Sequence, residues 1–155
     1  MQVEPIYRVV LFGHRDFDGH EMLDERLCAL LKKLLKTQPF LEIYIGRNGE
    51  FDRYAASAVK RMRHILGEER IALYCVLPYP CKDMEYYERY YDGVIVPTYK
   101  KRPHPKSAIE KRNRFMAERA DLVVCYVERE EGGAYAAVRY AQQCGKSVVN
   151  LAKNE

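Results

Sequence analysis

Strand-like and helix-like segments alternate along the whole chain, and this alternation constrains the fold more than any other feature. Apolar runs rich in β-branched residues predict strands at 7–12, 41–45, 70–77, 94–96, 122–127 and 147–151. Apolar residues at helical spacing predict helices between them, at 22–36, 51–66, 84–91, 106–120 and 133–144. Strict alternation is typical of parallel strands joined by right-handed crossovers. We therefore predict an α/β fold, a single Rossmann-like three-layer domain over residues 1–155 with a mostly parallel, doubly wound sheet.

The composition excludes several other classes of protein. Of the 155 residues, 48% are hydrophobic and 31% are charged, as in globular chains and unlike disordered ones. No apolar run approaches the ~20 residues that cross a bilayer. The first residues, MQVEPIYRVV, lack the pattern of a signal peptide, and the five cysteines form no CxxC pair. We expect a cytoplasmic protein with reduced thiols and no membrane partner.

The net charge of +4 is modest, and its excess lies mainly in residues 60–63 and 100–114. This distribution suits a local anionic partner. A footprint for duplex nucleic acid is normally more basic and more continuous. For this reason we do not expect nucleic acid as a partner.

Three loops that follow predicted strands have an unusual composition: 13–20, 46–52 and 128–133. In a doubly wound sheet, ligands bind outside the carboxyl ends of the strands, so these loops should share one edge. The glycines permit close backbone approach, and the polar residues supply hydrogen bonds. With an arginine from the helix before the fifth strand, the predicted ligand contacts are Gly13, His14, Arg15, Gly46, Arg47, Asn48, Gly49, Asp52, Arg112, Gly132, Gly133 and Ala134.

The glycine pair Gly132-Gly133 opens a predicted helix, whose free N–H groups and partial positive charge favour an anion. Taken alone, the pair could equally be a flexible turn, and three glutamates crowd the same loop. Arg112 and Arg114 offer forked donors for a phosphate or a carboxylate. Asp52 either caps the helix that follows it or accepts a ribose hydroxyl.

The segment GHRDFDGH, residues 13–20, alternates histidine and aspartate. An extended segment would place these side chains on one face, so a metal site is sterically conceivable. We favour a simpler interpretation, in which one aspartate caps the following helix and the histidines are partly exposed. We assign no metal.

In order, the segments FGHRDF, IGRNGEFDRYAASA, KRNRFM, ADLVVCYVE and GGAYAAVRYA resemble those of the SLOG superfamily over nearly the whole chain. These Rossmann-like domains are related to the lonely guy phosphoribohydrolases and to the DNA-processing recombination mediator. The likeness is closest to a branch of small bacterial members. It implies a nucleotide or nucleotide-derived ligand, for example an ADP-ribose-like compound, and no further cofactor is assigned.

In the phosphoribohydrolase branch, a PGGxGTxxE motif supplies a phosphate loop and a catalytic glutamate, and an upstream arginine holds the substrate. The arginine matches Arg112, but the glutamate position is Arg139 and the GT positions are Tyr135 and Ala136. Ala134 stands where other members often have threonine. The resemblance therefore favours binding over hydrolysis.

We consequently expect a binding domain that acts as a sensor or accessory module, and a homodimer or higher homo-oligomer. Two alternatives stay open. One is a phosphoribohydrolase-like enzyme that cleaves nucleoside monophosphates with another acid, Glu131 or Glu50. The other is a nucleic-acid-associated protein like the recombination mediator, based on the basic segments and the many tyrosines.

Overall fold

A computed structural model describes residues 5–153, which form one sheet flanked by helices. In chain order the elements are β1 (Ile6–Gly13), α1 (His20–Leu34), β2 (Phe40–Ile45), α2 (Glu50–Leu66), β3 (Ile71–Val76), α3 (Met84–Tyr90), β4 (Gly93–Ile95), α4 (Pro105–Arg119), β5 (Leu122–Tyr126), α5 (Gly132–Gln143) and β6 (Ser147–Asn150). All eleven predicted segments are present in the predicted order.

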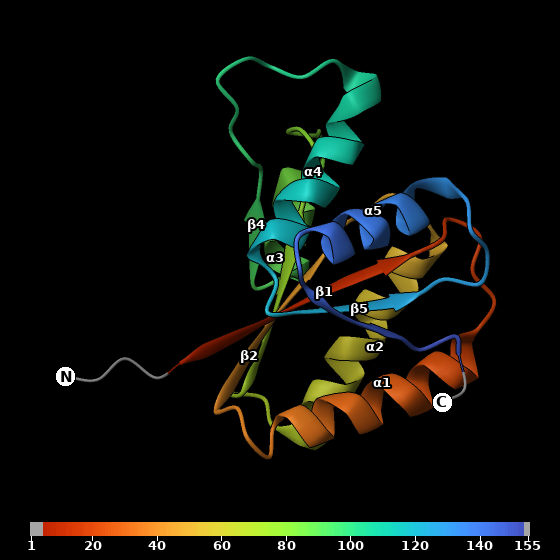
Figure 1. The fold of residues 1–155 in the computed structure, drawn as a ribbon. Helices are drawn as coiled ribbons and strands as arrows, with labels where there is room; N and C mark the ends of the chain where they lie inside the picture. Colours follow the sequence, from red (N-terminus) through yellow and green to blue (C-terminus); the bar gives the residue numbers. More distant parts are fainter. Residues whose placement is uncertain (1–4, 154–155) are drawn as a thin grey trace.

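The six strands are arranged in the order β4-β3-β2-β1-β5-β6, and every neighbouring pair is parallel. This arrangement confirms the predicted fold class. The sheet grows from β1 toward β4 over residues 6–95, and the crossover through α4 then returns to place β5 on the other side of β1. Figure 1 shows α1 and α2 on one face of the sheet and α4 and α5 on the other.

Helices on both faces explain why the central strands are continuously apolar. Val9, Val10, Leu11 and Phe12 of β1 are all buried, alternating between the two faces. Leu11 belongs to the core under α1 and α2, which also contacts α3, whereas Phe12 belongs to the core under α4 and α5.

The spacing of apolar residues places each long helix on the sheet. Leu23, Leu27 and Leu31 form the buried stripe of α1 at intervals of four residues. On α2 the buried residues include Ala55 and Ala58, whose small side chains allow a close approach to the strands. Within residues 5–153, no helix combines the length and the apolar character needed to cross a membrane.

The order of the strands reverses at β1, because the chain leaves β1 toward β2 and leaves β5 toward β6. The loops after β1, β2 and β5 therefore meet at the carboxyl edge of the sheet. The N-termini of α2 and α5 begin at the same edge. In open α/β sheets this switch point is where ligands bind.

Candidate functional site

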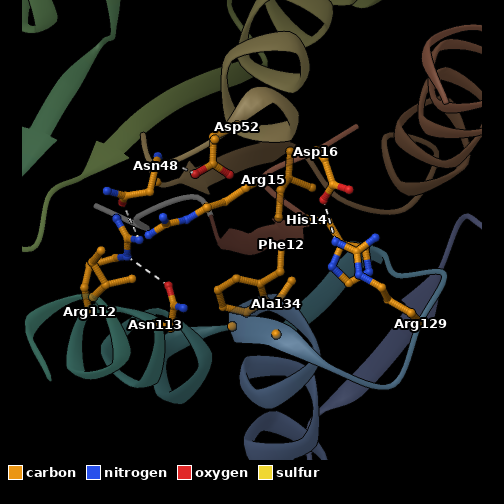
Figure 2. A pocket seen from close by; sticks show the side chains of 17 residues that line it. Phe12, His14, Arg15, Asp16, Asn48, Asp52, Arg112, Asn113, Arg129 and Ala134 are labelled. Atoms are coloured by element: carbon orange, nitrogen blue, oxygen red, sulfur yellow. Dashed lines mark hydrogen bonds and ion pairs between the residues drawn. The ribbon is translucent and has the colours of Figure 1, made fainter. Parts of the chain in front are cut away.

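A cleft of about 440 Å³ lies at the switch point, between the loops after β1, β2 and β5 (Figure 2). The structure brings together eleven of the twelve predicted contact residues in its lining: Gly13, His14, Arg15, Gly46, Asn48, Gly49, Asp52, Arg112, Gly132, Gly133 and Ala134. That they bind a ligand remains a prediction. Their convergence shows that the strand-end rule located the cleft correctly.

Arg112 on α4 is the buried cation of the cleft, with 2% of its surface exposed. Its guanidinium donates hydrogen bonds to Val76 O (2.9 Å), Asn48 Oδ1 (2.7 Å) and Asn113 Oδ1 (2.9 Å). Burial lowers the pKa of Arg112, while the Asp52 carboxylate acts in the opposite direction. Three of its five N–H donors thus fasten the loop after β2 to β3 and α4.

Gly46 leaves the space that this guanidinium occupies. A β-carbon on residue 46 would lie 2.7 Å from Arg112 Nη1, closer than side-chain contacts allow. The glycine at the end of β2 is therefore required by the close approach of the arginine.

Asp52 lies in the first turn of α2, and its Oδ2 accepts a hydrogen bond from the Asn48 N–H (2.9 Å). Burial raises the pKa of the Asp52 carboxyl; the Asn48 hydrogen bond and the charges of Arg112, Arg47 and Arg15 oppose this. Of the two roles predicted for Asp52, the helix cap is wrong, since Gly49 is the N-cap of α2 and no side chain caps that end. The carboxylate instead holds the loop before the helix through the Asn48 N–H. A contact with a ribose hydroxyl stays a prediction.

His14 is buried, with 6% of its surface exposed, and its Nε2 accepts a hydrogen bond from the Glu128 N–H (3.2 Å). A neutral imidazole that accepts at Nε2 carries its proton on Nδ1. This nitrogen lies 4.0 Å from the β-carbon position of Gly132, so it faces the glycine loop. Burial lowers the pKa of His14, and the Arg129 charge adds to this effect. At neutral pH His14 is therefore an uncharged donor at the edge of the cleft.

Gly132, Gly133 and Ala134 form the first turn of α5, and no side chain caps this helix end. The N–H groups of a first helical turn have no intrahelical partner, and the helix adds about half a positive charge. Gly132 has a φ of +90°, a conformation that favours glycine. A β-carbon at Gly133 would meet no atom within 4 Å, so the space in front of this turn is open. This geometry suits an anion.

Two further arginines line the cleft and differ in their contacts. Arg129 forms ion pairs with Asp16 (2.5 Å) and Glu131 (3.7 Å). Arg15 is exposed, and its side chain forms no hydrogen bond or ion pair with the rest of residues 5–153. Figure 2 shows the Arg15 side chain extending over the cleft toward the side where Arg112 lies. Arg15 is accordingly the cation available to a bound anion.

Arg47 is the one predicted contact residue that does not line the cleft. Its guanidinium donates a hydrogen bond to Tyr91 Oη (3.0 Å) and stacks on the Tyr87 ring (5.1 Å). It therefore joins the loop after β2 to the tyrosines of α3. Residue spacing could not reveal this, because successive side chains in the loop point in different directions.

Neither glutamate considered as an alternative catalytic acid lines the cleft. Glu50 accepts a hydrogen bond from the Phe17 N–H (3.1 Å), and its own N–H donates to Arg15 O (2.8 Å), so it connects the loop after β1 to α2. Glu131 is the exposed N-cap residue of α5 and pairs with Arg129.

The residues of GHRDFDGH do not converge on one point. Asp16 pairs with Arg129, Asp18 is exposed, and the His20 ring packs against Tyr54 at 4.2 Å. No group of three or more histidine, cysteine or acidic side chains within 5–153 is arranged to hold a metal ion. The predicted aspartate cap is wrong, since Gly19 is the N-cap of α1 and no side chain caps that end.

The sequence analysis missed three polar residues of the lining: Asp16, Asn113 and Arg129. Asn113 follows Arg112 directly, within the KRNRFM segment that carried the resemblance. Arg129 lies in the loop 128–133, of which only the glycines and the glutamates were considered. The ion pair between Arg129 and Asp16 joins two loops that are 113 residues apart, which local pattern does not reveal.

No family model matches this sequence, and no curated protein is significantly similar to it. Among solved structures, DNA processing protein A (DprA) from Streptococcus pneumoniae superposes with a TM-score of 0.68 and 16% identity. DprA from Helicobacter pylori, described for its single-stranded DNA binding mode, superposes with a TM-score of 0.62 and 18% identity. The chain shares its fold with part of each of these DprA chains. This likeness confirms the Rossmann-like fold expected from the resemblance.

Both superpositions cover 92% of this chain, but only 49% of the S. pneumoniae protein and 63% of the H. pylori protein. The chain thus spans about half to under two thirds of these DprA chains. At this level of identity the likeness shows the fold alone.

The expectation that nucleic acid is not a partner, which was drawn from the modest net charge, is wrong. The two solved structures compared above are DNA processing proteins, and one of them is described as binding single-stranded DNA. A modest net charge did not anticipate this, because single strands need only a short row of phosphate contacts and stacking positions.

Replacing Arg112 with alanine is expected to lower the free energy of unfolding by about 3–5 kcal/mol, because Val76 O and Asn48 Oδ1 lose their buried donor and Asp52 loses its counter-charge. The matched control is Arg114→Ala, an exposed arginine on the same helix, for which we expect about 0.5 kcal/mol or less. Urea unfolding measures both. Equal losses would show that Arg112 has no special structural role.

Stability should fall on acidification because of His14. The pKa of His14 is lower in the folded protein than in the unfolded chain. As the pH drops below about 6.5, the unfolded chain therefore takes up the proton first, and the free energy of unfolding falls by up to ~1.4 kcal/mol per pH unit. Asp52 has a raised pKa, so the protonation of its carboxyl has the opposite effect on stability as the pH falls. We expect a shallower loss between pH 7 and 5 in His14→Gln than in the natural protein, measured by urea unfolding at each pH. Parallel curves would contradict this.

Proposed function

We propose that this protein is a binding domain for the phosphate group of a nucleotide-derived ligand, and that it acts as a sensor or accessory module. The observation that carries the proposal is the first turn of α5, whose backbone N–H groups face an open cleft that also holds Arg15. A helix N-terminus and a free guanidinium in one cleft form an anion site.

The other groups of the cleft support this assignment. His14 offers an uncharged N–H toward Gly132, and Arg112 adds a fixed positive charge below the loop after β2. Asp16 is neutralised by Arg129, so it does not repel a phosphate strongly. The volume of about 440 Å³ lies within the range of small-molecule sites.

The side chains favour binding over hydrolysis. The two carboxylates of the lining already have partners, Arg129 for Asp16 and the Asn48 N–H for Asp52. The position of the glutamate in the phosphoribohydrolase motif is Arg139, which is exposed on α5 and does not line the cleft. The hydrolysis carried out by that branch uses a glutamate, which must lie within hydrogen-bond reach of the proton that it transfers.

Gly133→Val is the sharpest test, because the new side chain starts from a β-carbon position with no atom within 4 Å and would extend into the space in front of α5. We expect unchanged folding but loss of ligand binding in a thermal-shift screen with nucleoside monophosphates, ADP-ribose, NAD and ribose 5-phosphate. In the natural protein, a ligand at a hundred times its Kd raises the free energy of unfolding by about 2.7 kcal/mol. For a chain of this size, each kcal/mol raises the melting temperature by ~2–4 °C.

The control is Gln142→Val, an exposed position later on the same helix that does not line the cleft. It should keep the full shift. The proposal fails if no phosphate-bearing compound shifts the melting temperature of the natural protein. It also fails if Gly133→Val binds as the natural protein does.

A second candidate function is binding of single-stranded DNA, which the shared fold with the DprA proteins favours. The same cleft would then hold a backbone phosphate, and Arg15 would be its exposed contact. The basic stretch that includes Lys100, Lys101 and Arg102 would extend the positive surface.

Salt dependence separates the two functions. If a single strand is the ligand, the affinity for a short oligothymidylate should fall steeply with salt, with a slope near −0.7 for each phosphate contacted, and Arg15→Ala should lower the slope by about one contact. Fluorescence anisotropy at several salt concentrations measures this. Absent or salt-insensitive binding would exclude DNA.

A further inference from the structure

A second depression runs along the outer surface between α4 and α5, and it opens directly into the cleft. Its volume is about 640 Å³, and it shares Arg15, Ile109, Asn113, Gly132 and Gly133 with the cleft. We call it the α4–α5 groove. A ligand anchored by a phosphate at the glycine pair would therefore have a continuous path along α5.

The walls of the groove differ from those of the cleft, because they are largely apolar and aromatic. Ile109 of α4 and Ala136 and Ala137 of α5 are among its lining residues. Tyr135 and Tyr140 add two aromatic rings, so the groove combines flat hydrophobic surface with small residues that leave it open.

One aromatic ring of the groove is already stacked with a cation. The Arg114 guanidinium lies 5.0 Å from the centre of the Tyr140 ring, and it is fixed there by a hydrogen bond to Glu110 Oε1 (2.9 Å). Planar guanidinium groups and tyrosine rings are the surfaces on which nucleobases stack. Such a platform beside a phosphate site is suited to a base.

The charges of the groove also suit an anionic ligand. Arg15, Arg114 and Arg139 line it, against Glu110 as the single carboxylate among the described lining residues. Glu110 is paired with Arg114, which leaves Arg15 and Arg139 to favour negative charge in the groove.

We propose that the α4–α5 groove holds the base of a nucleoside 5′-phosphate whose phosphate lies at Gly132 and Gly133. This assignment rests on the proposed function and adds the nucleoside as the group that the protein distinguishes. The same nucleoside 5′-phosphate could be a free nucleotide or the end of a single strand, and the experiment separates these sources.

The test compares ribose 5-phosphate, which has no base, with the four common nucleoside 5′-monophosphates by isothermal titration. Stacking of one base should make the nucleotides bind about 5- to 150-fold more tightly than ribose 5-phosphate. Ala136→Trp is the blocking variant, because Ala136 is exposed on α5 and a larger ring there fills the groove without entering the core. Gln142→Trp, an exposed position of α5 outside the groove, is the matched control.

We expect Ala136→Trp to bind nucleotides only as weakly as ribose 5-phosphate, while its affinity for ribose 5-phosphate and the behaviour of Gln142→Trp stay unchanged. The inference is overturned if the natural protein binds nucleotides no more tightly than ribose 5-phosphate. It is also overturned if Ala136→Trp keeps the preference for nucleotides. If ribose 5-phosphate and nucleotides both fail to bind, the proposed function falls together with it.

A 5′-phosphorylated oligothymidylate, titrated at two salt concentrations, identifies the source. Tighter binding than thymidine monophosphate, with a steep loss at higher salt and sensitivity to Ala136→Trp, assigns the groove to the end of a strand. Equal binding of the two compounds assigns it to the free nucleotide. If the oligonucleotide binds more tightly than thymidine monophosphate and Ala136→Trp does not weaken this binding, the strand lies elsewhere. That outcome would overturn the assignment of the groove.

Discussion

The buried guanidinium of Arg112 is the interaction on which the candidate site depends. It joins the end of β3, the loop after β2 and α4 through hydrogen bonds to Val76 O, Asn48 Oδ1 and Asn113 Oδ1. Since a buried charge is costly without partners, these contacts specify the positions of all three segments. The same arginine moderates the raised pKa of Asp52, whose carboxylate holds the Asn48 N–H.

Because a buried guanidinium needs partners within the fold, Arg112 has a structural role, whereas the exposed Arg15 is available to a ligand. Arg112 uses three donors within the fold, whereas the Arg15 side chain has no hydrogen bond or ion pair among the described residues and lies over the cleft. Arg112, which matches the substrate-holding arginine of the phosphoribohydrolases that the sequence resembles, has three of its donors bound within the fold. In the proposed function, the first turn of α5 and the α4–α5 groove provide the surfaces for the ligand.

The resemblance to solved structures covers nearly the whole chain, yet it extends over only part of the DprA proteins. A shared Rossmann-like fold fixes where ligands bind, because the strand order reverses at β1. It does not fix what binds there, since that depends on side chains such as Arg15, Arg139 and Tyr140, which no backbone similarity transfers.

The sequence by itself determined the order and type of the elements and the position of the cleft. Apolar periodicity marks β1 and α1 unambiguously, and parallel strands bring their terminal loops to one edge. Only the tertiary structure decided which side chains face that edge. Arg47 donates a hydrogen bond to Tyr91, and Glu50 accepts one from the Phe17 N–H. Arg129 pairs with Asp16, which lies 113 residues earlier in the chain. These directions follow from packing between distant segments, and no local pattern encodes them.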